Sequence, residues 1–438
     1  MLEKIRKAIW GDLSGEEFKR FSMLALTLLF IIGTYWLMRP IKDGLFVSLV
    51  GKNYLPWAKI LSFAFILPLV LFYAKLVDLV EKHKLFYILC SAYSVLFLII
   101  TFLLKHPTIG LDNTVADPNR VLGWVIYLAI ESFGSLLISL FWSFVASSTD
   151  TKSAKKGYGL IIFGAQIGSM TGPAIAINAQ TLGIPFLTTI VAVGLAIVPF
   201  LIKFFITRFP SLEEETKISE EKAKPKKKTS PIEGLKLLFT RNYLLGVLGI
   251  STLYEVVGTI LDLQLKFLAA DAYDTPEKLT SFLGMFGFAT NATTFILALV
   301  GTSYFIRTFG LTFCLVTYPV CVAIVVLNAW AFPVLWVLFG TMILIKALSY
   351  ALNNPCKEMM YIPTSKDVKF KAKSVIDMFG GRSAKAAGSS IKAAVTTTAA
   401  PIAYGSVISL GIIAVWISAA LFVGRTNKKL TESGKIIE

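Results

Sequence analysis

Cysteine and histidine are scarce: the 438 residues include four cysteines and two histidines. The cysteines lie in or beside apolar runs without metal-ligand spacing, so we interpret them as small core residues and not as a disulfide framework. His83 and His106 are too far apart in the sequence to indicate a local metal site. His-Glu-x-x-His and Gly-x-Ser-x-Gly motifs are also missing, and so few histidines argue against general-base chemistry. We therefore expect no enzyme, no metal and no cofactor.

Polar stripes are missing from the long apolar runs. Hydrophobic residues make up 55% of the chain, and the mean hydropathy is +0.70. Several runs approach the roughly 20 residues that a helix needs to cross a bilayer, and Leu, Ile, Val and Phe occur all around them. Lipid is therefore the expected solvent, because backbone polar groups in lipid must be satisfied within helices.

Acidic residues are too few to balance the basic ones. The chain has 43 Lys and Arg against 27 Asp and Glu, which gives a formal net charge of +16. Such an excess can indicate nucleic-acid binding, cytoplasmic loops that follow the positive-inside rule, or a site for anions. A chain that lies mostly in a membrane argues against nucleic acid as a partner. The positions of the cations must then distinguish cytoplasmic loops from an anion site.

The apolar runs predict twelve membrane-spanning helices. We expect them at 21–38, 57–80, 85–104, 121–147, 157–178, 184–206, 243–266, 279–302, 309–328, 332–353, 374–399 and 402–424. Every even-numbered loop carries Lys or Arg, whereas the loops after spans 5, 9 and 11 carry none. The positive-inside rule therefore predicts that both termini are cytoplasmic.

A polar segment at 208–241 divides the spans into six plus six. We interpret it as a solvated linker, with contact to lipid headgroups as the alternative. The expected domains are thus an N-terminal half at 1–207, the linker, and a C-terminal half at 242–438. This division is typical of transporters built from two repeats, so the predicted fold is all-α and major-facilitator-like.

Span 5 is rich in glycine and contains the pair Gly172-Pro173. Small residues four apart allow helix backbones to approach closely. The glycines therefore predict either tight helix packing or a bend in the span.

Ionisable residues within or at the ends of the spans carry the functional signal, with Arg39 and Lys42 at the end of span 1 and Lys357 just after span 10. Each costs about 2.5–3.5 kcal/mol at a helix centre on insertion scales, so such residues usually face an internal cavity. They are Arg39, Lys42, Glu131, Glu255, Asp262, Lys266, Lys346, Lys357, Asp377, Arg382, Lys385 and Lys392. The cations outnumber the acids, which predicts a site for a multivalent anion such as an organic phosphate or a nucleotide.

Span 11 is the most informative of these segments. Arg382, Lys385 and Ser389 recur at spacings of three and four and would share one helical face. The alternative is a loop whose cations snorkel to the surface. The sequence is not a P-loop, because the Gly-x4-Gly-Lys-Ser/Thr pattern and a preceding strand are absent.

Three stretches resemble a known family. They are Arg39-Pro40-Ile41-Lys42-Asp43-Gly44, the segment Glu131-Ser132-Phe133-Gly134-Ser135 running on to Phe141-Trp142-Ser143-Phe144, and Cys356-Lys357-Glu358-Met359-Met360-Tyr361-Ile362-Pro363. They are similar to motifs of the nucleotide transporter (ATP/ADP translocase) family of plastids and obligate intracellular bacteria. Lys371 to Gly388 also matches in order and spacing. The chain departs from the family's pattern in span 7. The family's glutamate would fall near Gly258, and this chain has Glu255 and Asp262 on either side of that position instead.

The resemblance implies a twelve-helix carrier that exchanges ATP for ADP, with or without phosphate, by alternating access. It implies transport roles for Lys42, Glu131 and Lys357. With the intramembrane charges, the expected substrate-binding set is Arg39, Lys42, Glu131, Glu255, Asp262, Lys266, Lys357, Arg382 and Lys385. We expect a monomer in the inner membrane of an intracellular bacterium. Open alternatives are a proton-coupled importer of nucleotides, NAD or organic phosphates, and a membrane scaffold that transports nothing.

Overall fold

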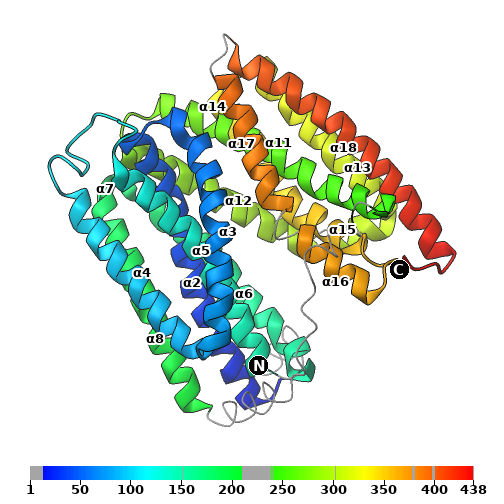
Figure 1. Cartoon of the computed structure of the whole chain (residues 1–438), viewed down its shortest axis with the longest axis horizontal. Helices are drawn as coiled ribbons and strands as arrows, with labels where there is room; N and C mark the ends of the chain where they lie inside the picture. Colours follow the sequence, from blue (N-terminus) through cyan, green and yellow to red (C-terminus); the bar gives the residue numbers. More distant parts are fainter. Residues whose placement is uncertain are drawn as a thin grey trace. The chain divides into compact units, whose positions relative to one another are not determined.

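The computed structural model describes residues 13–149, 151–209, 238, 240–300, 302–376, 380–396 and 400–437. These residues are almost entirely helical (Figure 1). The elements are, in chain order, α2 (Gly15–Leu49), η1 (Lys52–Tyr54), α3 (Leu55–Leu79), α4 (Lys82–Leu104), α5 (Val121–Ser148), α6 (Thr151–Ile177), α7 (Ala179–Leu182), α8 (Ile184–Arg208), α11 (Asn242–Ala272), α12 (Pro276–Val300), α13 (Thr302–Ala331), α14 (Leu335–Leu348), η2 (Ser349–Asn353), α15 (Asn354–Met359), α16 (Lys366–Val375), α17 (Gly381–Thr396) and α18 (Pro401–Glu432). Most of the expected linker lies outside the described residues.

Among the described residues, eleven helices are long and apolar enough to cross a membrane. They correspond to the expected spans 1 to 10 and 12. The expected span at 374–399 is represented by α17, which is shorter and more polar than the others. Its residues 381–396 are helical, so the helix predicted there is confirmed over this range and the loop alternative is wrong. Asp377 lies outside the described residues.

Helix α2 is longer than the sequence predicted. Ser14 caps its start, since the Ser14 hydroxyl accepts from Glu17 N–H while the Glu17 carboxylate accepts from Ser14 N–H. The helix then continues through Pro40 to Leu49, so Arg39 and Lys42 lie inside it and not at its end. A buried lysine and its neighbours are therefore held on a continuous helix.

The described chain forms two compact units. Among the described residues, unit 1 comprises 13–51, 64–149, 151–209 and 273–288, and unit 2 comprises 52–63, 238, 240–272, 289–300, 302–376, 380–396 and 400–437. Helices α3 and α12 each contribute one part to either unit. The first residues of α3, including Lys59, thus belong to the same unit as α11.

In unit 1, α2 packs most extensively against α6 and also against α5 and α8. Figure 1 shows α4 running beside α8, which is its main partner. The glycines of α6 explain the close α2–α6 contact, because a Cβ added at Gly164, Gly168 or Gly172 would collide with backbone atoms of α2. The packing predicted for span 5 is therefore present.

In unit 2, α11 packs against α17 and α18, and α13 packs against α18 (Figure 1). Gly388 lets α17 approach α11, since a Cβ there would lie 2.6 Å from the Val256 carbonyl oxygen. The polypeptide after α14 widens into the π-helical turn η2, and α15 follows with Pro355 in its first turn. Such π-turns often occur at functional sites, and this one leads to Lys357.

Candidate functional site

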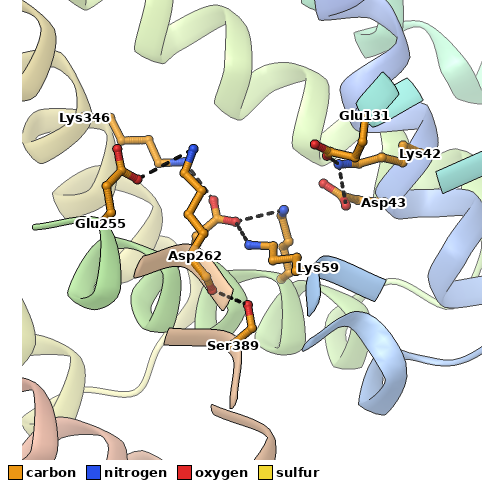
Figure 2. A network of polar contacts seen from close by, with 10 residues as sticks. Lys42, Asp43, Lys59, Glu131, Glu255, Asp262, Lys346 and Ser389 are labelled. Carbon is orange, nitrogen blue, oxygen red and sulfur yellow. Dashed lines mark hydrogen bonds and ion pairs between the residues drawn. The ribbon is translucent and has the colours of Figure 1, made fainter. Parts of the chain in front are cut away.

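Lys42 is the most deeply buried of the described charged residues of unit 1, with a side chain only 5% exposed. Its ammonium group donates to the carboxylate of Glu131 from α5, and Asp43 Oδ1 lies 3.8 Å from Lys42 Nζ. Nζ also lies 4.3 Å from the centroid of the Tyr127 ring. Figure 2 shows these carboxylates turned toward Lys42. The lysine is thus ion-paired, whereas Glu131 keeps 31% of its side chain exposed.

Arg39 lies about one helical turn before Lys42 and is half-buried. Its guanidinium carbon lies 4.6 Å from the centroid of the Trp36 ring and 5.9 Å from that of Tyr35. A guanidinium held over aromatic rings keeps its charge and its planar donors. Arg39 and Lys42 therefore place two cations on one stretch of α2.

Asp262 gathers three lysines in unit 2. Lys346 Nζ lies 2.7 Å from Asp262 Oδ1, and the Nζ atoms of Lys266 and Lys59 lie 2.9 and 3.1 Å from Oδ2. Figure 2 shows the Lys59 and Lys346 side chains converging on this carboxylate. We call Lys59, Asp262, Lys266 and Lys346 the Asp262 cluster. Its lysines come from α3, α11 and α14, so three separate helices meet at one carboxylate.

Glu255 and α17 form a second charged group of unit 2. Lys385 Nζ lies 3.7 Å from Glu255 Oε2, and the lysine side chain remains 58% exposed. Ser389, one turn further along α17, is fully buried and donates to the Lys385 carbonyl oxygen at 2.8 Å. Arg382 is half-buried at the start of the same helix. The predicted cations of span 11, Arg382 and Lys385, thus lie on a helix. The most buried polar side chain of that helix, however, is Ser389.

Lys357 lies on an aromatic support just after the π-helical turn. Its Nζ atom is 4.8 Å from the centroid of the Tyr254 ring. That ring packs against the buried rings of Tyr318 and Trp416, with centroids 5.6 and 6.0 Å away. The stack orients Tyr254, and Tyr254 in turn orients the lysine.

The predicted site residues thus fall into separate groups of unit 1 and unit 2. Lys42 and Glu131 form one pair, Asp262 and Lys266 belong to the Asp262 cluster, and Glu255 pairs with Lys385. The acids therefore neutralise part of the positive charge that the sequence led us to expect. The chemistry available is that of ammonium and guanidinium donors partly occupied by carboxylates, which suits a competing oxyanion.

Two lysines at these groups were absent from the predicted binding set. Lys59 was not predicted, although it lies within the expected second span and the rule for intramembrane charges could have found it. Lys346 was noted as an intramembrane cation but not assigned to the set. Lys392 is also buried, 3% exposed, with Nζ 5.1 Å from the centroid of the Phe267 ring.

Comparison with known sequences gives matches along almost the whole chain. A family model described as TLC ATP/ADP transporter matches residues 1–114, 122–335 and 326–426. The ADP,ATP carrier protein 1 of Rickettsia typhi is 26% identical over 453 residues, which cover 89% of this chain and 88% of the relative. The ADP,ATP carrier protein 1 of Chlamydia muridarum is 27% identical, covering 95% and 90%. The chloroplastic ADP,ATP carrier protein 2 of Arabidopsis thaliana is 26% identical, covering 94% and 76%.

Solved structures with the same arrangement of helices are transporters. A bacterial homologue of the iron transporter ferroportin aligns with a TM-score of 0.59 at 15% identity, covering 94% of this chain and 98% of that one. The xylose transporter XylE from E. coli aligns with a TM-score of 0.58 at 12% identity, covering 93% and 95%. At such identities the likeness concerns the fold, and it confirms the major-facilitator-like architecture predicted from the sequence.

Proposed function

The chain belongs to the TLC ATP/ADP transporter family, and from this membership we propose that it exchanges ATP for ADP across a membrane. The observation that carries the proposal is the set of cationic groups on helices long and apolar enough to cross a bilayer. Charges in such helices are expensive and are retained where a substrate uses them. A nucleotide with two or three phosphates is a substrate that would use them.

Nucleotide phosphates would be bound by Arg39, Lys42, Lys357, Arg382 and Lys385. Arg39 offers a planar donor fork suited to phosphate oxygens, and the lysines offer point charges on flexible stems. The aromatic rings beside Arg39, Lys42 and Lys357 support these cations without neutralising them. We assign Glu131 a different role, since a carboxylate would repel phosphate but balances Lys42 in the empty carrier.

Exchange follows from the charge of the empty site. A bound nucleotide neutralises several cations, so the loaded carrier reorients with a nearly balanced charge. The empty carrier must reorient with like charges in a low dielectric, where their repulsion is weakly screened. Return of the empty carrier is therefore slow, and a second nucleotide from the other side restores the starting state. Transport would thus proceed by alternating access, with ATP imported and ADP, with or without phosphate, exported.

The basic loops favour a topology with both termini in the cytoplasm. The relatives from Rickettsia and Chlamydia make the inner membrane of an intracellular bacterium the membrane we propose. We also propose that the carrier acts as a monomer and that its two six-helix halves at 1–207 and 242–438, joined by the segment at 208–241, are its functional repeats.

Proton-coupled import of a nucleotide is the second candidate. It would need a carboxylate that releases and regains a proton in each cycle, and Glu131, Glu255 and Asp262 are the acids available. Each lies within 4.0 Å of a lysine ammonium group. These contacts give the acids a charge-balancing role in the empty carrier, which is the role that exchange requires.

Proteoliposomes test the proposal directly. Vesicles loaded with ADP should take up labelled ATP much faster than empty vesicles, with no dependence on a pH gradient. Empty vesicles containing the protein should remain close to protein-free vesicles. Equal uptake by loaded and empty vesicles, or uptake that disappears with the gradient, would favour the symport alternative.

A further inference from the structure

The Asp262 cluster has more positive charge than its own carboxylate balances. Three ammonium groups lie within 3.1 Å of a single carboxylate, which leaves a net charge of +2. Glu255, drawn beside the cluster in Figure 2, pairs with Lys385 at 3.7 Å. Three of the four charged side chains that make up the cluster are thus cations, which is more than a single ion pair contains.

The cluster is buried but not sealed. The side chains of Lys266, Asp262, Lys59 and Lys346 are 10, 15, 18 and 25% exposed, respectively. Charges this far from water repel one another more strongly than they would at the surface. A ligand with about two negative charges would relieve this repulsion, and the residual exposure shows that the lysines are not fully enclosed by protein.

The geometry points to a subsite for the terminal phosphoryl group of the nucleotide, with Asp262 as the anion that holds the lysines in its absence. This inference rests on the proposed function. A terminal phosphoryl group carries about −1.5 to −2 charges at neutral pH, which matches the excess of the cluster. Its oxygens are acceptors of the same kind as those of Asp262, so the three ammonium groups can turn from one to the other on their flexible stems.

This arrangement accounts for recognition of more than one substrate. ATP and ADP end in the same phosphoryl group, so one subsite serves both, and inorganic phosphate carries the same chemistry. Adenosine has no such group and gains nothing from the cluster. Lys59 of α3 and Lys346 of α14 converge on Asp262 of α11. They would therefore be the residues that distinguish a phosphorylated substrate from adenosine.

Inorganic tripolyphosphate is the probe that isolates this subsite, since it ends in the same group but lacks a base and a sugar. Its binding to the full-length purified carrier should be measured by calorimetry, with adenosine as the comparison. Lys59→Gln and Lys346→Gln should each weaken tripolyphosphate binding about ten- to hundredfold, the range expected for a lost charge-assisted hydrogen bond. Lys75→Gln is the matched control, because Lys75 is exposed on the same helix as Lys59.

Asp262→Asn provides the opposite test. If Asp262 competes with phosphate for the lysines, its neutralisation should tighten tripolyphosphate binding about tenfold, the effect of one lost competing contact. A purely structural Asp262 would instead leave the affinity unchanged. Thermal unfolding of each variant without ligand identifies folding defects, and the lysine variants supply the answer where Asp262→Asn does not fold.

Labelled ATP exchange in ADP-loaded vesicles separates the inference from the proposed function. Suppose that ATP exchange occurs and that the three variants Lys59→Gln, Lys346→Gln and Lys75→Gln bind tripolyphosphate with equal affinity. This result would overturn the subsite and leave the proposed function intact. Binding of tripolyphosphate that depends on Lys59, without any nucleotide exchange, would keep the subsite and overturn the function. The expected result is exchange together with a loss of affinity confined to the Lys59 and Lys346 variants.

Discussion

Lys42 illustrates how a single charge is kept inside a membrane helix. Its ammonium group is buried, and the carboxylate of Glu131 reaches it from another helix while Asp43 lies close by on its own. Removing one partner of a buried ion pair leaves the other uncompensated, which costs more than the pair contributes. The balance between Lys42 and Glu131 therefore matters most when no substrate is bound.

Glu131→Gln should slow the return of the empty carrier more than it alters nucleotide affinity. The variant leaves Lys42 with less negative charge around it, and a bound phosphate can replace what was lost. ATP binding measured by calorimetry should change little, whereas the slow net uptake into empty vesicles, which requires return of the empty carrier, should fall to the level of protein-free vesicles. Steeply weakened binding with unchanged reorientation would mean that Glu131 has another role.

Lys357→Ala should remove a direct phosphate contact. The lysine ammonium group is held over the Tyr254 ring, and alanine supplies no cation in its place. ATP binding should therefore weaken about tenfold or more, and exchange should be lost at low ATP concentrations. Lys429→Ala, at an exposed position of α18, is the control with normal exchange. Wild-type exchange by the Lys357 variant would exclude the lysine from the site.

At the scale of elements, close helix contacts decide where the charges lie. Gly164, Gly168 and Gly172 put α6 against the backbone of α2, the helix that carries Arg39 and Lys42. In unit 2, Gly388 does the same for α17 against α11, which carries Asp262. Without a hydrophobic drive between helices in lipid, such contacts are the main source of helix association. Small residues thus position the cationic helices.

Gly168→Ala should destabilise the carrier. A Cβ at this position would lie 2.5 Å from the Leu29 carbonyl oxygen, a backbone atom that cannot move alone. Overpacking of this kind costs about 1–3 kcal/mol, so thermal unfolding in detergent should occur at a lower temperature. Gly159→Ala in the same helix meets nothing within 4 Å and should be neutral or stabilising. Equal unfolding temperatures for both variants would show that the α2–α6 contact is not tight.

For the whole molecule, exchange of ATP for ADP has an electrical consequence. ATP carries one more negative charge than ADP, so each exchange moves one net charge through the membrane. A charge crossing a potential of 100 mV changes in free energy by about 2.3 kcal/mol. The direction of net exchange should therefore respond to the membrane potential.

An inside-positive potential should favour uptake of ATP into ADP-loaded vesicles. At about 60 mV the ratio of ATP inside the vesicles to ATP outside should shift roughly tenfold, as expected for the movement of one charge. Potassium gradients with valinomycin would set the potential, and equal exchange of labelled ADP for ADP is the control that moves no net charge. A ratio indifferent to potential would mean that another ion, such as phosphate leaving with ADP, balances the charge.

The sequence by itself determined the number and positions of most spans, because the apolar runs must meet the length of a bilayer wherever they occur. It also put Asp262 and Lys266 in one span, four residues apart, where the structure pairs them. Only the tertiary structure decided which distant charges meet, such as Lys42 with Glu131, 89 residues away, and Lys59 with Asp262, 203 residues away. Helical spacing orders residues along one element, whereas pairing between elements depends on which faces of the helices pack against each other.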